Sequence, residues 1–244
     1  MKQIAQGAEA KIYVDFLSSK FFNSPTIIKD RTPKSYRLKE LDDKLRSQRT
    51  KSESKILIKA QSAGVNVPKV DSINKEKFQI YMQYIQGERL SETLNSKPLE
   101  AQIKIIRQIA EQVAKLHNNN IIHSDLTTSN TILINPAKQN PHQSADNQLI
   151  NKLNNKIAES KLSAYDSEPA IFIIDFGLSF ISQRIEDKAV DVHLIKQALE
   201  AKHWQNWEVL FQEFIKAYNP KEKTQILERL KKVESRGRYK HSCE

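Results

Sequence analysis

The spacing of apolar positions changes along the chain, and the change predicts two kinds of local structure. Short apolar runs at residues 12–14 and 26–28 are rich in β-branched and aromatic residues and predict strands. Apolar positions at helical spacing from about residue 34 to 63 predict one long helix, which Gly64 is placed to terminate. Two further runs, 67–70 and 78–85, predict strands, so the first third of the chain consists of strands around a helix.

Helical spacing dominates the rest of the sequence. A short helix is expected at residues 90–95, a longer one after Pro98, and three more between residues 187 and 233. Strand-like runs at 131–134 and 171–174 flank a stretch rich in Asn, Gln and Ser at 136–169. We interpret this stretch as a mobile insertion, with an amphipathic helix as the alternative. Strands followed by helices favour a two-lobed α+β fold over a doubly wound sheet.

Composition narrows the class of protein. Hydrophobic residues make up 39% and charged residues 28%, as in globular proteins, and no apolar run is long enough to predict a membrane span. The first residues lack the apolar core of a secretion signal. Cys243 is the only cysteine, which excludes an internal disulfide framework. These features predict a reducing location, the cytoplasm or alternatively the nucleus.

The net charge of +10 is concentrated in two segments. Residues 29–59 contain eleven basic and five acidic residues, and residues 231–241 contain five basic residues and one acidic residue. Such clusters favour a polyanionic partner, nucleic acid included. A solvated, lysine-rich surface explains the same numbers, so charge alone does not decide between the two.

Two short motifs carry the chemistry. The first runs from His123 to Asn130 and contains Asp125, and the second, Ile174-Asp175-Phe176-Gly177, begins about 45 residues later. In both, a carboxylate follows apolar residues and opens a polar loop. Phosphoryl transfer needs one carboxylate to orient the attacking hydroxyl or water, and a second, helped by an Asn oxygen, to hold magnesium.

Together the motifs resemble the H-x-D-x-x-x-x-N catalytic loop and the D-F-G magnesium loop of protein kinases. The resemblance implies that Asp125 is the catalytic carboxylate and that Asn130 and Asp175 are magnesium ligands. His123 is interpreted as a core residue that braces the loop. Lys29, at the end of a predicted strand, resembles the lysine that grips the ATP phosphates, and Glu53 is its expected helix partner, with Glu40 as runner-up.

The glycine-rich loop of kinases has a reduced counterpart here. Its place is taken by a segment with a single glycine, Gln6-Gly7-Ala8-Glu9-Ala10, so phosphate binding is expected to depend less on the backbone. Glu9 is expected either to bind the metal or to pair with Lys29. The resemblance further implies that the nucleotide contacts the end of the 78–85 strand, at Met82, Tyr84 and Ile85.

Features of signalling kinases are missing from the sequence. Gly177 is fourteen residues from Asp191, which already lies in a predicted helix, so there is no room for an activation loop or an A-P-E-like stretch. Ser124 precedes Asp125 in place of the arginine that couples to a phosphorylated loop. These absences favour ATP hydrolysis or self-phosphorylation over phosphorylation of protein substrates.

A wider set of segments resembles the PRPK-type atypical kinases, the small kinase/ATPase subunits of the KEOPS (EKC) complex. Outside the 136–169 insertion it spans nearly the whole chain: Gln6–Ala10, Ile27–Lys29, Lys34–Arg37, Leu41-Asp42, Leu45-Arg46, Arg49-Thr50, His123–Asn130, Ile174–Leu178, Glu186–Asp191 and Arg236-Gly237-Arg238. Ser124 stands where that family usually has glycine.

The resemblance implies a bilobal kinase-like fold and a role in threonylcarbamoyladenosine formation on tRNA. Its N-terminal lobe would be residues 1–85, its C-terminal lobe 86–234 and its basic tail 235–244. The cofactors would be ATP and Mg²⁺, with Mn²⁺ as an alternative ion. The C-terminal lobe would contact the KEOPS transferase subunit and the N-terminal lobe a small subunit. The tail would reach tRNA through Arg236, Arg238 and Lys240, as phosphate contacts; a frayed solubilising tail is the alternative.

Three other functions use similar residues. A free-standing serine/threonine kinase would share the catalytic residues and is disfavoured by the missing activation segment. A small-molecule phosphotransferase of the aminoglycoside-kinase type needs a larger helical lobe than this chain has. A non-catalytic scaffold is disfavoured because Lys29, Asp125, Asn130 and Asp175 are all present.

Overall fold

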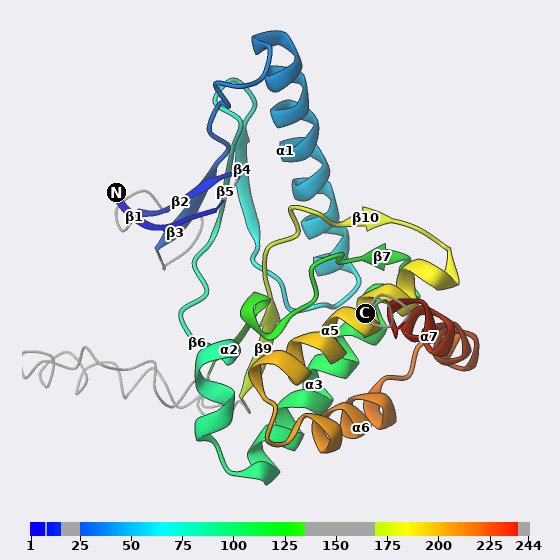
Figure 1. Cartoon of the computed structure of the whole chain (residues 1–244). Coiled ribbons are helices and arrows are strands. Elements are labelled where there is room, and N and C mark those ends of the chain that lie inside the picture. Colours follow the sequence, from blue (N-terminus) through cyan, green and yellow to red (C-terminus); the bar gives the residue numbers. More distant parts are fainter. Residues whose placement is uncertain (8, 16–24, 135–168, 239–244) are drawn as a thin grey trace, which may run out of the picture.

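The computed structural model describes residues 1–7, 9–15, 25–134 and 169–238, which form two lobes (Figure 1). A β-sheet and one long helix make the N-terminal lobe, and helices make most of the C-terminal lobe (Figure 1). The predicted two-lobed α+β fold is therefore confirmed. The expected lobe boundary, between residues 85 and 86, falls between the fifth and sixth strands.

The N-terminal lobe has one antiparallel sheet in the order β1-β2-β3-β5-β4. Its strands are β1 (Lys2–Gln6), β2 (Lys11–Asp15), β3 (Thr26–Asp30), β4 (Val70–Asn74) and β5 (Gln79–Gln83). Alternate residues of β5 are buried, as expected for a strand with one face toward a core. Its Ile80 and Met82 share a core cluster with Ile56 and Leu57 of helix α1 (Lys39–Ser62).

The end of α1 follows the sequence prediction. Gly64 has φ 73°, a left-handed conformation in which glycine is favoured because it lacks a Cβ. The N–H of Gly64 donates to the carbonyl of Gln61 and that of Val65 to Ala60, both at 3.0 Å. This pair of bonds satisfies carbonyls that the helix end would leave free, and it turns the chain into the core at Val65.

Three details of the N-terminal lobe were predicted wrongly. The strand expected at 67–70 lies at 70–74, because Pro68 has no N–H to donate to a ladder. Val67 is buried all the same, which explains its apolar signal. Strand β1 was not predicted, since its residues are exposed and mostly polar. Helix α1 begins at residue 39 and not 34, after a loop that contains Pro33.

The C-terminal lobe contains two small sheets, with strand orders β6-β8-β9 and β10-β7, among its helices. Its strands are β6 (Glu88–Arg89), β7 (Ile121–Ile122), β8 (Thr131–Ile134), β9 (Ala170–Ile173) and β10 (Phe180–Ile181). Its helices are α2 (Leu90–Thr93), η1 (Leu94–Ser96), α3 (Leu99–Asn118), η2 (Thr128–Asn130), α5 (Ile185–Lys202), α6 (Trp207–Ala217) and α7 (Lys223–Arg238).

Helix α3 forms the centre of this lobe. Ile106, Ile109, Val113 and Leu116 follow one another at helical spacing and are completely buried. Burial of each such side chain stabilises the fold by about 1.5–3 kcal/mol. Helices α5 and α6 add Ile195, Leu199, Leu210 and Phe214 to the same cluster. Within the described residues, no helix has the length and apolar character needed to cross a membrane.

Two predicted segments lie partly or almost wholly outside the described residues. The expected insertion at 136–169 lies outside them except for Pro169. The tail expected from residue 235 begins as the last turn of α7, which continues to Arg238, and residues 239–244, with Lys240, lie outside.

Candidate active site

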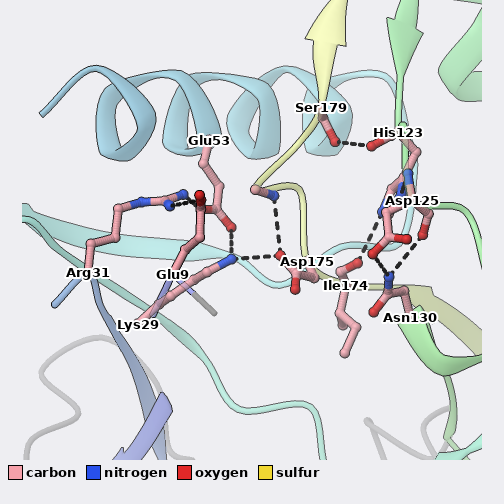
Figure 2. Close-up of polar contacts among 11 residues, drawn as sticks. Glu9, Lys29, Arg31, Glu53, His123, Asp125, Asn130, Ile174, Asp175 and Ser179 are labelled. Carbon is pink, nitrogen blue, oxygen red and sulfur yellow. Dashed lines mark hydrogen bonds and ion pairs between the residues drawn. The ribbon is translucent and has the colours of Figure 1, made fainter. Parts of the chain in front are cut away.

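A buried ion pair in the N-terminal lobe connects β3 with α1. Nζ of Lys29 lies 2.6 Å from Oε1 of Glu53, and both side chains are at least nine-tenths buried (Figure 2). The predicted partner of Lys29 is thus present, whereas Glu40, the runner-up, is exposed near the start of α1. A buried ammonium held by a carboxylate has a fixed position, which is what a phosphate-binding lysine requires.

Arg31 is a second buried cation that the sequence analysis missed. Its Nη2 lies 2.6 Å from Oε2 of Glu53, so the two oxygens of one carboxylate hold two different cations (Figure 2). Arg31 follows Lys29 by two residues, and residues two apart in an extended chain point to the same face. This spacing could have indicated that both side chains face α1.

Glu9 pairs with two arginines and not with Lys29, and its alternative role as a metal ligand stays a prediction. It forms ion pairs with Arg49 of α1 and, at 3.7 Å, with Arg31, so the expected pair with Lys29 is wrong. Gly7 and Ala10 close a turn through a backbone hydrogen bond of 2.9 Å. The two arginines therefore connect the loop at residues 7–10 to α1 and to the end of β3. A glycine-rich loop would instead depend on backbone contacts. Gln6 ends β1, and Ala8 lies outside the described residues.

Asp175 joins the two lobes. It follows β9, and its Oδ1 lies 2.7 Å from Nζ of Lys29 (Figure 2). Burial alone would raise the pKa of Asp175, but Lys29 and the N–H of Gly177 outweigh it and hold the pKa below its ordinary value. Burial alone would lower the pKa of Lys29, and the carboxylates of Glu53 and Asp175 raise it above normal. Both groups are therefore charged at neutral pH.

The backbone around Asp175 explains the neighbouring glycine. Asp175 has φ 62°, a conformation that Asp tolerates better than most residues. A Cβ at Gly177 would lie 3.1 Å from Oδ1 of Asp175 and 3.2 Å from Nζ of Lys29. A side chain there would require the Asp175 carboxylate and the Lys29 ammonium to shift by a few tenths of an ångström, so glycine suits the close approach of the two groups.

Asp125 and Asn130 form a second unit in the C-terminal lobe. Nδ2 of Asn130 donates to the backbone carbonyl of Asp125 at 2.9 Å and to Oδ2 of Asp125 at 2.8 Å (Figure 2). These bonds fix the amide so that its oxygen remains available as a ligand. The N–H of Ile174 donates to the carbonyl of Asn130 at 2.9 Å, which places this unit beside Asp175. The predicted carboxylates and amide are thus brought to one place.

His123 braces the loop, as the sequence analysis expected. It is fully buried, its Nε2 donates to the carbonyl of Ile174 at 3.1 Å, and its Nδ1 accepts the N–H of Asp125 at 3.3 Å. Its ring packs edge-on against Phe176, with centroids 4.8 Å apart. The side chain therefore connects the two motifs, as a bracing residue would.

Asp191 of α5 is a buried carboxylate under the catalytic loop, and the sequence analysis gave it no role. It accepts the N–H of His123 at 2.6 Å and the N–H of Ser124 at 2.7 Å. Ser124 has φ 65°, which costs a residue other than glycine on the order of 1 kcal/mol. The hydrogen bond to the carboxylate offsets that cost, which explains how a residue other than glycine is accommodated here.

The residues predicted to line the nucleotide pocket at the lobe connection lie as follows. Met82 on β5 and Ile85 beyond it are buried, and Met82 belongs to the main core cluster. Tyr84 is half-buried, and its N–H donates to the carbonyl of Pro25 at 3.1 Å. Their contact with a nucleotide stays a prediction.

His203, directly after α5, contacts the catalytic loop through a hydrogen bond to Thr128. Its Nδ1 donates to Oδ1 of Asn95 at 2.6 Å, which leaves Nε2 to accept the hydroxyl of Thr128 at 3.0 Å. Burial lowers the pKa of His203, and Lys202 lowers it further. The folded protein therefore holds His203 neutral, in the form that these two hydrogen bonds require.

Stability is expected to decrease in acid because of His203. The unfolded chain protonates this histidine near its ordinary pKa of about 6.5, before the folded chain does, so the free energy of unfolding falls as pH drops below that value. Urea unfolding between about pH 7.5 and pH 5.5 should show a larger loss for the wild type than for His203→Gln, which cannot titrate. Parallel curves for the two proteins would contradict the assignment.

The donor set fits a magnesium nucleotide. Among the described residues no group of three or more His, Cys, Asp or Glu side chains could hold a metal alone. Magnesium in phosphoryl-transfer sites is commonly held by one or two carboxylates together with substrate phosphates, which is what Asp175 and Asn130 can offer. The half-exposed side chain of Asp175 leaves such a ligand accessible, and Lys29 supplies a cation for the phosphates.

Comparison with known proteins agrees with this geometry. A family model described as the RIO domain matches residues 10–139. The KEOPS complex subunit Bud32 of Pyrococcus abyssi is 38% identical over 98% of this chain and 97% of its own length. The chain belongs to the Bud32 family of RIO-domain atypical kinases. The family assignment confirms the resemblance found in the sequence.

Two further matches extend the comparison. A probable bifunctional tRNA threonylcarbamoyladenosine biosynthesis protein of Methanobrevibacter smithii is 31% identical over 98% of this chain, which spans 37% of that longer protein. A crystal structure of the Rio2 kinase–ADP/Mg²⁺–phosphoaspartate complex from Chaetomium thermophilum has a TM-score of 0.54 and 13% identity, covering 96% of this chain and 70% of the other. The likeness to Rio2 shows a shared fold, and the Bud32 relative places the chain within the family.

Proposed function

We propose that this Bud32-family chain binds Mg-ATP between its lobes and hydrolyses it, with self-phosphorylation as a side activity. The ion pair of Lys29 with Asp175 carries the proposal, because it brings a buried cation of one lobe to the magnesium-loop carboxylate of the other. Lys29, oriented by Glu53, would bind the ATP phosphates. Asp175 and Asn130 would hold Mg²⁺, or Mn²⁺ as an alternative ion.

Asp125 is the group that would act on the acceptor. Its carboxylate is half-buried and oriented by the amide of Asn130, so it can accept a hydrogen bond from a hydroxyl or a water molecule. A bound magnesium ion would neutralise charge on the phosphates. The side chains of the protein would hold the reacting groups in place. Lys29 would position the phosphates, Asp175 the metal and Asp125 the attacking oxygen.

The segment after the magnesium loop favours hydrolysis over phosphorylation of protein substrates. Only residues 178–184 separate Gly177 from α5, and two of them form β10, which pairs with β7. This segment is too short to build a peptide-docking platform of the kind that activation segments provide. A free-standing protein kinase is therefore the weaker alternative.

We further propose that the chain is a KEOPS subunit that supports threonylcarbamoyladenosine formation on tRNA in the cytoplasm or nucleus. The proposal is supported by the Bud32 relative, which is a KEOPS complex subunit, and by the fused threonylcarbamoyladenosine biosynthesis protein. Two exposed apolar surfaces, one on each lobe, are suited to two different protein partners.

The first surface, here called the β10 patch, consists of Leu178, Phe180 and Ile181, which are 58%, 40% and 50% exposed. Strand β10 pairs with β7, at the end of a two-stranded sheet, so its other edge has no partner strand among the described residues. Exposed apolar edges of this kind are typical protein contacts. We assign the β10 patch to the KEOPS transferase subunit.

The second surface, here called the α1 patch, consists of Tyr36, Leu38 and Leu41, which are 76%, 80% and 50% exposed. The buried carboxylate of Asp42 holds the loop that presents them. It accepts the backbone N–H of Lys34 at 3.4 Å and pairs with Arg37 at 3.4 Å. A loop fixed from within loses little entropy on binding. We assign the α1 patch to the small KEOPS subunit.

One exposed substitution in each patch should separate the two partners. Ile181→Asp is expected to weaken transferase binding about 30-fold or more, as loss of an interface hot spot does, and to leave binding of the small subunit unchanged. Leu38→Asp should do the reverse, and aspartate at this N-cap position should not harm α1. Each variant is the control of the other in calorimetry; loss of both partners in one variant, or of neither, would contradict the assignments.

The C-terminal tail is proposed to contact tRNA phosphates. In the structure Arg236 pairs with Glu186 at 2.6 Å, and Arg238 ends α7. Replacing Arg236, Arg238 and Lys240 with Gln should reduce the slope of log K against log salt by about two to three. Lys69, Lys75 and Lys77, exposed at the opposite lobe, provide a control with the same charge change. An unchanged slope in the tail variant would overturn the contact.

A further inference from the structure

A chain of buried polar side chains lies beneath the catalytic loop, and the proposed chemistry does not use it. Tyr218, at the end of α6, contacts His117 of α3, and His117 contacts Asp191 of α5. Each of the three side chains is completely buried. Burial of three polar groups is costly unless each is hydrogen-bonded, so the arrangement needs a reason.

The hydrogen bonds define the direction of the chain. The hydroxyl of Tyr218 lies 2.5 Å from Nδ1 of His117, and Nε2 of His117 lies 3.3 Å from Oδ2 of Asp191. Burial, with the nearby carboxylates of Asp191 and Glu222, raises the pKa of Tyr218 far above its ordinary value, so its hydroxyl keeps its proton. The Asp191 carboxylate can only accept, so the proton of the neutral imidazole lies on Nε2, and the hydroxyl of Tyr218 donates to Nδ1.

The opposite tautomer would be unfavourable at this place. A bare Nε2 would direct its lone pair at the Asp191 carboxylate, and the carboxylate would lose one of its donors. Oδ2 of Asp191, the oxygen that His117 contacts, is also the one that accepts the N–H of His123, and Oδ1 accepts that of Ser124. A rotation of this carboxylate would release the left-handed turn at Ser124, and Asp125 is the next residue.

We propose that Tyr218 and His117 are positioning residues for the phosphoryl-transfer reaction. Tyr218 fixes the tautomer of His117, His117 fixes the Asp191 carboxylate, and the carboxylate fixes the turn that places Asp125. The ring of Tyr218 stacks on Phe214 and lies edge-on to His117, so its position is set by packing and is independent of the hydroxyl. The C-terminal helices thereby contribute to the geometry of the catalytic loop.

Tyr218→Phe isolates the hydroxyl, because the ring and its contacts remain. In the full chain, kcat for ATP should fall about tenfold, as is typical when a residue that orients a ligand is removed, while KM for ATP stays within about twofold. Hydrogen exchange at the amides of His123 and Ser124 should accelerate. Tyr81→Phe, which removes a hydroxyl bonded to Gln79 in the N-terminal lobe, should change neither quantity.

His117→Gln tests the proposed order of action. The glutamine amide can donate to Asp191 without help from Tyr218, so adding Tyr218→Phe to this variant should have little further effect on exchange or kcat. The exchange measurement does not depend on turnover, so it decides the matter even for a chain that proves inactive. Unchanged exchange at His123 and Ser124 in Tyr218→Phe, or effects of the two substitutions that simply add, would overturn the proposal.

Discussion

Replacing Asp175 with asparagine is expected to lower magnesium-dependent ATP turnover by about 10³-fold. The substitution removes the carboxylate proposed to hold the metal, and metal stabilisation of the transition state is worth several kcal/mol, with about 1.4 kcal/mol for each factor of ten. Asparagine tolerates the left-handed backbone at this position, and Lys29 keeps its bond to Glu53, so the fold should survive.

Steady-state turnover against magnesium concentration measures this effect. Asp71→Asn, on the edge strand β4, makes the same chemical change away from the site and should leave turnover unaltered. Circular dichroism should show equal folding of both variants. If Asp175→Asn turned over ATP at the wild-type rate, Asp175 would not be a magnesium ligand.

Glu53→Gln is expected to have the largest effect on stability. The carboxylate holds Lys29 and Arg31, each at 2.6 Å, and all three side chains are buried. Loss of its charge removes the nearest counter-ion of two buried cations, which leaves Asp175 beside Lys29 and Glu9, at 3.7 Å, beside Arg31. We expect a cost of about 3 kcal/mol and a fall in Tm of about 10 °C. Turnover should fall as well, because Lys29 loses the partner that orients it.

Thermal unfolding provides the measurement, and Glu40→Gln provides the control. Glu40 lies on the exposed part of the same helix, so its substitution should change the free energy of unfolding by less than about 0.5 kcal/mol. Adding Arg31→Met to Glu53→Gln removes the buried cation whose remaining partner, Glu9, is the more distant, and it should recover part of the loss. A cost of under about 1 kcal/mol for Glu53→Gln would show that the pair is not structurally important.

The parts of the site that depend on local sequence were predictable. Asp125 and Asn130 belong to one short loop, and Asp175 and Gly177 to another, so their chemistry could be inferred from spacing alone. Lys29 and Glu53 lie further apart, but a strand followed by a helix limited the candidates for the partner to two. Their ion pair is present as expected.

Contacts that depend on the packing of distant elements were not predictable in the same way. Glu9 pairs with Arg31, just after β3, and with Arg49 of α1. The position of α1 against the sheet determines which side chains Glu9 can reach. Asp191 lies 67 residues beyond Ser124, whose N–H it accepts. Tyr218 approaches His117 only because α6 packs on α3. A single sequence shows whether such residues are polar or apolar, but it does not show which residues they contact.

The charge of residues 29–59 also has a different meaning in the structure. Arg31, Arg46 and Arg49 are paired with Glu53, Asp42, Asp43 and Glu9 within the N-terminal lobe. Arg46 helps to hold the start of α1 through Asp42 and Asp43, while lysines such as Lys51, Lys55 and Lys59 remain exposed. These three arginines are engaged within the lobe, so the exposed lysines are what this segment offers to a polyanion.

The most direct test of the central claim is ATP turnover by the purified chain, measured alone and with a KEOPS transferase subunit and tRNA. We predict that these partners stimulate hydrolysis and that Asp125→Asn abolishes the stimulated rate. Turnover that the partners do not change, together with phosphorylation of added proteins or small molecules, would contradict the account and identify a free-standing kinase.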